Sequence, residues 1–178
     1  MFVSEITQLP PASFISPLQG KVYDTLSALK IPFERVDTDT VITMEDCAAI
    51  NDRLNMNMVK PLFLTNAQRS RFYLFVSRGD KAFQSKAFSQ ATGSSRVSFA
   101  PREEFEARLG VEIGAATIFS KMLDPDNAIQ LALDVDVVGD EYYGCSDGTT
   151  TSYLKLRTSD VVERFLPHIG CVPTIVSL

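Results

Sequence analysis

The sequence predicts an α/β domain of the α+β type, in which helices surround a compact, mixed and largely antiparallel sheet. The main observation is a pair of apolar runs, residues 58–66 and 71–81, joined by a short polar connection. This pattern is typical of a β-hairpin with a well-buried arm. Further strand and helix patterns interleave irregularly along the chain, which favours a mixed sheet over a doubly wound fold. With 178 residues and no linker or repeat, we expect a single domain, 1–178.

The residues before the hairpin predict two helices and one strand. Residues 1–15 form an extended lead-in. Ser16-Pro17 then opens a helix, with the serine as N-cap and proline in the first turn, and Ile31-Pro32 ends it. The alternating segment 33–37 predicts a strand. Residues 43–46 resemble a capping sequence and predict a second helix after them.

The residues after the hairpin predict the remaining elements. A glycine-containing loop at 110–117 leads into an apolar segment, 117–123, and a turn at 124–127. Gly93 closes the first of three helices, which cover 83–90, 100–109 and 158–166. The strand patterns cover 96–99, 129–135, 142–145, 150–156 and 174–178.

Basic residues are concentrated in one part of an otherwise acidic chain. The net charge is −5, yet between Arg53 and Arg102 nine basic residues face a single acid, Asp80. The other 128 residues carry eight basic and 21 acidic ones. Either the basic residues create a local field for an anionic partner, or they scatter and pair with acids from elsewhere in the chain. A basic face would hold a nucleic acid by its phosphates.

Composition also suggests where the protein acts. The N-terminus lacks the features of a signal peptide, and no apolar run has the roughly 20 residues of a membrane helix. The three cysteines lie far apart, which favours free thiols in a reducing compartment. We therefore expect a cytoplasmic protein without a membrane partner, and its acidity makes a monomer the default.

Few residues offer catalytic or metal-binding chemistry. The single histidine, His168, leaves almost no material for a triad or a metal site, so we expect no metal and no cofactor. Gly110 and Gly114 match neither a phosphate loop nor a dinucleotide fingerprint. Lys60, at the mouth of the first hairpin arm, is either a site residue or a strand-end lysine whose stem lies along apolar surface. The residue pattern alone favours the second interpretation.

An ordered series of stretches carries more information than any of them alone. They occur at 22–26, 31–36, 59–64, 72–74, 79–81, 96–100, 109–114, 144–145, 151–156 and 160–166. The series resembles the YbaK/ProX superfamily, specifically the freestanding prolyl-tRNA synthetase-associated domain, over residues 18–178. The resemblance implies an aminoacyl-tRNA deacylase that hydrolyses mischarged tRNA in trans, with alanyl-tRNA for proline as the expected substrate. It implies tRNA as the partner, with prolyl-tRNA synthetase as a further candidate, and no DNA.

The resemblance also implies a site. Lys60 matches the family's lysine, which contacts the 3′ end and the ester, and is the expected catalytic residue. Water would attack the ester without a metal or a covalent enzyme intermediate, while lysine and backbone donors stabilise the charge on the carbonyl oxygen. The expected substrate-binding residues, from the glycine loop and the turn after residue 145, are Gly110, Gly114, Ala115, Thr117, Ser146, Asp147 and Thr150. The expected tRNA-binding residues are Arg69, Arg71, Arg78 and Lys81.

The chain departs from the family pattern at several pocket positions. Pro61 stands where many members have asparagine, and Ser146-Asp147 replaces a His-Pro pair. Thr150 replaces a second asparagine, and Ile113 replaces a proline of the glycine loop. These changes are compatible with a different amino-acid preference, a slow enzyme, or a tRNA-binding or regulatory domain that has lost the reaction. Hydrolysis of another small ester or amide is a third hypothesis.

Overall fold

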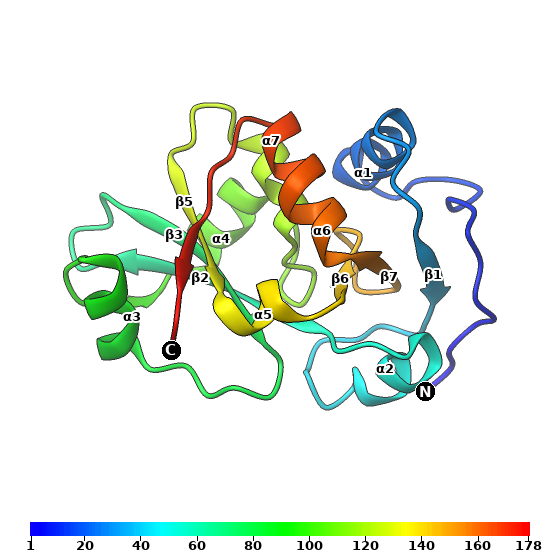
Figure 1. Cartoon of the computed structure of the whole chain (residues 1–178), viewed down its shortest axis with the longest axis horizontal. Helices are drawn as coiled ribbons and strands as arrows, with labels where there is room; N and C mark the ends of the chain where they lie inside the picture. Colours follow the sequence, from blue (N-terminus) through cyan, green and yellow to red (C-terminus); the bar gives the residue numbers. More distant parts are fainter.

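The computed structural model describes residues 1–178 and contains two sheets (Figure 1). In the larger sheet the strand order is β4-β2-β3-β5-β8, with bounds Val97–Phe99, Val59–Asn66, Phe72–Arg78, Ile129–Asp134 and Thr174–Val176. The predicted hairpin is confirmed as β2 and β3, which pair antiparallel at the centre of this sheet. The strands β5 and β8 add to β3 in parallel, so the sheet is mixed.

The second sheet has three antiparallel strands, where the sequence predicted one continuous sheet. Its order is β1-β7-β6, with bounds Glu34–Asp37, Ser152–Arg157 and Tyr142–Ser146. An isolated parallel bridge between Met58 and Gly144 links the start of β2 to β6. The predicted α+β fold class is confirmed, and the two sheets meet at the N-terminal end of β2.

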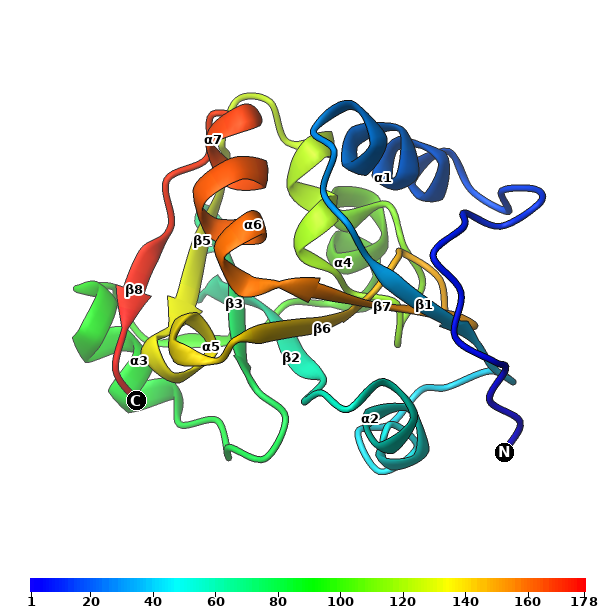
Figure 2. The same ribbon diagram turned by 45° about the vertical axis from the view of Figure 1, so that its right-hand side comes forward.

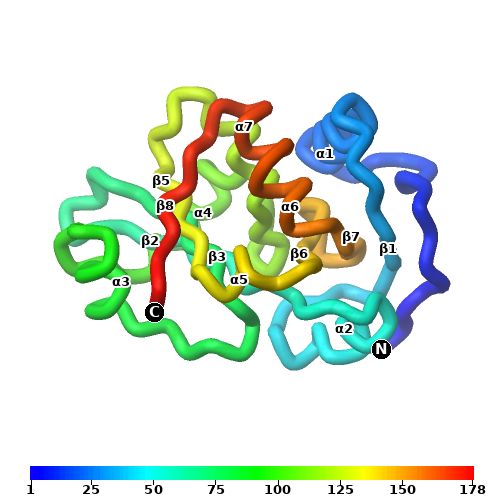
Figure 3. The backbone as a smooth tube through the Cα atoms, in the orientation of Figure 1, coloured from blue at the N-terminus to red at the C-terminus, as the bar shows by residue number.

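The helices cover both sheets. Their bounds are α1 Pro17–Ala28, α2 Ala48–Leu54, α3 Ser85–Thr92, α4 Arg102–Leu109, the 3₁₀ helix η1 Ile118–Leu123, α5 Val135–Gly139, α6 Thr158–Asp160, the π-helical turn η2 Val161–Phe165 and α7 Leu166–His168. Figure 2 shows α1, α4 and the α6–α7 segment on one side of the three-stranded sheet and α2 on the other. The tube in Figure 3 shows the N-terminal segment running beside β1, where Val3 bridges Thr38 and Thr7 bridges Arg35.

Local hydrogen bonds explain where the first two helices begin. As predicted, Ser16 caps α1, because its hydroxyl accepts a hydrogen bond from the N–H of Gln19 at 3.1 Å. The predicted capping sequence at 43–46 acts one turn earlier than expected. Thr43 donates its hydroxyl to Asp46 at 2.8 Å and accepts the N–H of Asp46 at 3.3 Å, whereas the N-cap of α2 is Cys47, which makes no side-chain cap bond.

Two segments differ from their sequence-based assignments. The strand predicted over 129–135 ends one residue earlier, at Asp134, and Val135–Gly139 forms a short helix. Its N-cap is Asp134, whose side chain accepts a hydrogen bond from the N–H of Asp136. The last helical segment runs from Thr158 to His168 and includes a π-helical turn, which apolar spacing does not reveal.

The core has three parts, and the site lies between the first two of them. The largest cluster fills the space between the larger sheet and the side that carries α1, α4 and α6–α7. A second cluster, which includes Val36, Ile50 and Tyr153, lies beneath α2, and a third, which includes Phe75 and Phe88, lies beneath α3. Both faces of β3 are therefore covered, and this strand is buried from Phe72 to Ser77. None of the helices has the length and apolar character needed to cross a membrane.

Candidate active site

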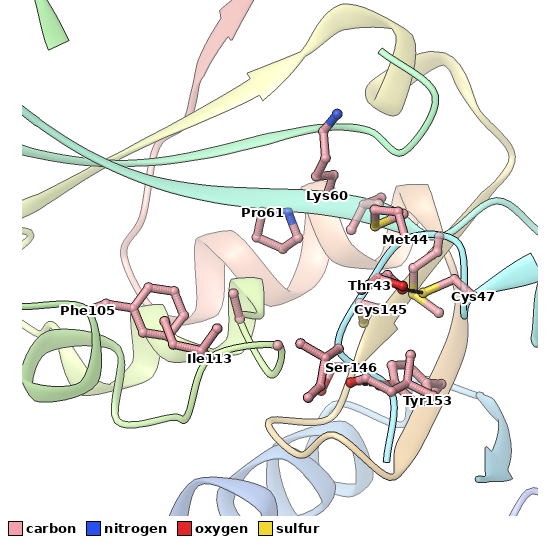
Figure 4. A pocket seen from close by; sticks show the side chains of 16 residues that line it. Thr43, Met44, Cys47, Lys60, Pro61, Phe105, Ile113, Cys145, Ser146 and Tyr153 are labelled. Atoms are coloured by element: carbon pink, nitrogen blue, oxygen red, sulfur yellow. Dashed lines mark hydrogen bonds between the residues drawn. The ribbon is translucent and has the colours of Figure 1, made fainter. Parts of the chain in front are cut away.

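A cavity of about 240 Å³ opens where the start of β2 meets the end of β6 (Figure 4). Sixteen residues line it, and eleven of them are hydrophobic. They come from the segment before α2, the start of β2, the region from α4 to the glycine loop, and β6 with its neighbour β7. The full set is Val41, Ile42, Thr43, Met44, Cys47, Met58, Val59, Lys60, Pro61, Phe105, Ile113, Gly114, Ala116, Cys145, Ser146 and Tyr153.

The glycine loop reaches this cavity because one of its residues has no side chain. Gly114 has φ of 95°, a conformation that favours glycine. A Cβ at this position would lie 3.3 Å from the Cα of Ile42 and 3.4 Å from the Cγ2 of Thr150. The loop is also tied to the neighbouring turn, since Thr117 donates its hydroxyl to the carbonyl of Ser146 at 2.8 Å. The close approach of three chain segments therefore depends on a glycine at this place.

Lys60 contributes its stem to the cavity, while its charge lies elsewhere in this structure. The side chain is half-buried, and its ammonium donates a hydrogen bond to the carbonyl oxygen of Lys81. Figure 4 shows the amine pointing away from Ser146 and Tyr153. The stem thus lies along apolar surface at the cavity, as expected for a strand-end lysine, and a backbone carbonyl holds the ammonium.

Ser146 lines the cavity, but its hydroxyl is already used within the turn. It donates to the carbonyl of Thr149 at 2.5 Å and accepts the N–H groups of Gly148 at 3.0 Å and Thr149 at 3.1 Å. One donor and two acceptor sites exhaust what a hydroxyl offers. Ser146 therefore shapes the turn and has no hydrogen bond left for a ligand in this arrangement.

The neighbouring residue, Asp147, faces the opposite way. Its fully buried carboxylate accepts hydrogen bonds from the side chains of Gln19, Tyr23 and Thr149, each at 2.8 Å. Burial, and after it the charge of Asp147, raises the pKa of Tyr23 above its usual range. Asp147 thus joins the turn to α1 and does not line the cavity.

The remaining predicted substrate-binding residues do not line the cavity. Thr150 donates its hydroxyl to Glu112 at 3.1 Å, which connects the turn to the glycine loop. Gly110 ends α4 in a left-handed conformation with φ of 66°. Ala115 is buried in the core. Of this set, only Gly114 and Ser146 line the cavity itself.

The four predicted tRNA-binding cations fall into two pairs. Lys81 donates to the buried Asp134 at 2.9 Å and forms an ion pair with Asp136 at 2.5 Å, and Arg78 lies 3.4 Å from Asp80. In contrast, Arg69 and Arg71 are exposed and form no ion pair. They lie in the turn between β2 and β3, at the end of the hairpin away from Lys60.

Sequence reasoning missed the segment 41–47 as part of the site. Its first residue donates its N–H to the carbonyl of Thr150 at 2.8 Å, and Tyr153 donates its hydroxyl to the carbonyl of Val41 at 3.4 Å. These bonds hold the segment against the turn that follows β6. The Thr43-to-Asp46 capping signal indicated an ordered turn, but no local signal indicated its long-range partner.

The side chains that line the cavity include no evident general base or activated nucleophile. The lining set contains no Asp, Glu or His. Burial, followed by the nearby charge of Asp46, raises the pKa of Cys47 to about 11, and burial raises the pKa of Cys145 above its usual range. Both thiols therefore stay protonated near neutral pH and are poor nucleophiles. The cavity suits the binding of a small apolar group.

Comparison with known proteins assigns the family. Residues 38–163 match the model of the aminoacyl-tRNA editing domain. The chain belongs to this family. The editing domain is 29% identical to the prolyl-tRNA editing protein ProX of Acetoanaerobium sticklandii over 114 residues, which cover 64% of this chain and 70% of that protein. The predicted resemblance to the YbaK/ProX superfamily is thus confirmed.

Solved structures show that the editing domain shares its fold with proteins of low sequence identity. Hypothetical protein APE2540 superposes with a TM-score of 0.70 at 21% identity, and the match covers 89% of this chain and 99% of that one. A candidate trans-editing enzyme for prolyl-tRNA synthetase superposes with a TM-score of 0.65 at 16% identity, covering 93% of this chain and 99% of that one. Both matches span nearly the whole of each solved chain.

Proposed function

We propose that this editing domain hydrolyses the ester bond of mischarged aminoacyl-tRNA in trans, with alanyl-tRNA for proline as the expected substrate. One observation carries the proposal. The hairpin arm that contains Lys60, the glycine loop and the end of β6 are far apart in the sequence, yet all three line one cavity. The family of the chain, and the relative named as a prolyl-tRNA editing protein, support the same reaction.

The size and lining of the cavity support a small apolar acyl group as ligand. About 240 Å³ surrounded mainly by hydrophobic side chains accommodates a methyl-sized side chain. Discrimination by size in such a pocket is worth about 1–3 kcal/mol per methylene, so selection between similar amino acids is moderate. The nucleotide part of the substrate then remains outside the cavity, on the surface near Lys60.

The proposed mechanism uses Lys60 and backbone donors to stabilise the transition state. Rotation of its flexible side chain carries the Lys60 ammonium from the Lys81 carbonyl to the cavity mouth, where it faces the ester carbonyl oxygen. Gly114 and Ala116 line the cavity and their N–H groups make no hydrogen bond within the protein, so we assign them as donors to the same oxygen. Water adds to the carbonyl carbon, the bond to the ribose oxygen breaks, and that oxygen takes up a proton. The protonated thiols support direct attack by water over a covalent intermediate.

A second candidate function, tRNA binding without turnover, is favoured by a different observation. In this structure the Lys60 ammonium is bonded to a backbone carbonyl, and the Ser146 hydroxyl is fully engaged within its turn. A protein that keeps this arrangement with substrate bound would hold the tRNA without assisting hydrolysis. Its affinity would fall steeply as the salt concentration rises.

Deacylation assays with the wild type, Lys60→Ala and Lys21→Ala separate these candidates. The substrates are alanyl-tRNA for proline, a panel of other mischarged tRNAs and small aminoacyl esters. Removing one stabilising donor lowers kcat by roughly 10²–10³-fold, so we expect a loss of this size in Lys60→Ala and none in Lys21→Ala, which changes an exposed lysine on α1. Equal turnover in all three proteins would exclude Lys60 as the catalytic residue. Absence of turnover on every substrate, with tRNA binding intact, would favour the second candidate.

A further inference from the structure

A group of unpaired cations lies at the end of the larger sheet that is remote from the cavity. Of the 17 lysine and arginine side chains, seven form no ion pair: Lys21, Lys30, Lys60, Arg69, Arg71, Lys86 and Arg96. The last four lie in the basic stretch, which is the region between Arg53 and Arg102, and are all exposed. We call these four residues the distal basic surface.

Strand pairing brings these four residues to the same region. Asn66, the last residue of β2, pairs with Val97, the first residue of β4. Arg96 immediately precedes Val97 and therefore lies beside the turn that carries Arg69 and Arg71. Lys86 lies on α3, which packs against β4. Figures 1 and 3 show α3 and the turn between β2 and β3 at the same end of the molecule.

A polar hollow forms part of this surface. It has a volume of about 460 Å³, and its six lining residues include no hydrophobic and no acidic side chain: Ser85, Lys86, Ser89, Gln90, Ser94 and Arg96. Lysine, arginine, serine and glutamine side chains are those that contact phosphate oxygens in nucleic-acid complexes. The absence of carboxylates leaves nothing in the hollow to repel an anionic backbone.

The distance between the distal basic surface and the cavity indicates how long a ligand must be to contact both. Lys60 and Asn66 are six residues apart on β2, so the cavity and the distal basic surface are separated by about 20 Å at roughly 3.3 Å per residue. A free amino acid or a terminal nucleoside cannot reach both places. We propose that the distal basic surface binds the phosphodiester backbone of the tRNA while its aminoacylated end lies in the cavity; this inference rests on the proposed function.

Salt-dependent binding of uncharged tRNA tests the proposal without requiring activity. The test variants are Arg69→Gln/Arg71→Gln and Lys86→Gln/Arg96→Gln. The matched control is Lys21→Gln/Lys30→Gln, which removes the same charge from two exposed lysines outside the surface. Each lost phosphate contact should lower the slope of log affinity against log salt by about 0.7–0.9. We expect a smaller slope and weaker binding in both test variants, and wild-type behaviour in the control.

Deacylation kinetics then separate this proposal from the proposed function. With full-length alanyl-tRNA, the test variants should show a higher KM and little change in kcat. With the alanyl ester of a short oligonucleotide that ends at the 3′ adenosine, this increase in KM should disappear, because the short substrate cannot span about 20 Å. A wild type that binds tRNA but does not deacylate it would overturn the proposed function, and the binding slopes would still decide the role of the surface.

Three outcomes would overturn the distal basic surface as an RNA site. In the first, both test variants bind tRNA with the affinity and salt slope of the wild type. In the second, they keep tRNA binding but lose association with a protein such as the synthetase, which would make the surface a protein interface. Equal weakening in the test variants and in the control would also count against the proposal, because it would reflect net charge alone.

Discussion

The two ends of strand β2 carry basic residues in very different surroundings. At the cavity end, the Lys60 ammonium is bonded to the Lys81 carbonyl, and Lys81 itself is paired with Asp134 and Asp136. At the hairpin turn, Arg69 and Arg71 are exposed and have no acidic partner. The interpretation that the basic residues pair with acids is confirmed for Arg78 and Lys81, whereas a field for an anionic partner at the turn stays a prediction. At the cavity end, Lys81 is held by two carboxylates, whereas Arg69 and Arg71 at the turn form no ion pair within the chain.

A comparison of two lysine substitutions, one at each end, should give the largest difference that tests this contrast. Lys81→Met leaves the buried carboxylate of Asp134 without its cation, and we expect a loss of about 3 kcal/mol in the free energy of unfolding. Lys86→Met removes an unpaired, exposed charge and should change stability by less than about 0.5 kcal/mol. Urea denaturation of both variants measures the difference. Similar losses in the two proteins would show that pairing does not distinguish the two ends.

A smaller loss of stability is expected when alanine replaces either of two glycines that have a left-handed backbone conformation. Gly93, next to the polar hollow, has φ of 64° and space for a methyl group, so Gly93→Ala should cost about 1 kcal/mol through the backbone alone. Gly114, at the cavity, has φ of 95° and would also press a Cβ against Ile42 and Thr150. For Gly114→Ala we expect a loss of about 2 kcal/mol in the free energy of unfolding, and reduced deacylation. If Gly93→Ala were the more destabilised protein in thermal unfolding, the tight packing at the cavity would be refuted.

Much of the fold could be predicted because its signals are local. The cap at Ser16, the central hairpin and the glycine that closes α3 each depend on residues close in sequence. The division into two sheets could not be predicted in this way, since it depends on which distant strands pair. The same holds for the segment 41–47, whose partner Thr150 lies more than half the chain away.

The site shows a similar division between local and long-range information. The resemblance indicated which segments matter, and Lys60, Gly114 and Ser146 do line one cavity. It could not indicate side-chain directions. Adjacent residues at a strand end point to opposite faces, so Ser146 reaches the cavity while Asp147 turns towards α1. The ion pair between Lys81 and Asp134 likewise could be found only from the tertiary structure.

The smallest effect concerns the pH dependence of the cavity end. A hydrogen bond from Lys81 holds the pKa of Asp136 below its ordinary value of 3.8, so this pairing stabilises the fold above pH 3.8 and is lost as the pH falls through the lower folded value. The stability difference between the wild type and Asp136→Asn should therefore shrink when urea denaturation is compared at pH of about 6 and about 3. Arg69→Gln, which breaks no ion pair, should show no such convergence. A difference that stays constant for Asp136→Asn would mean that its effect comes from packing near α5 rather than from charge, and would weaken the contrast between held and free cations.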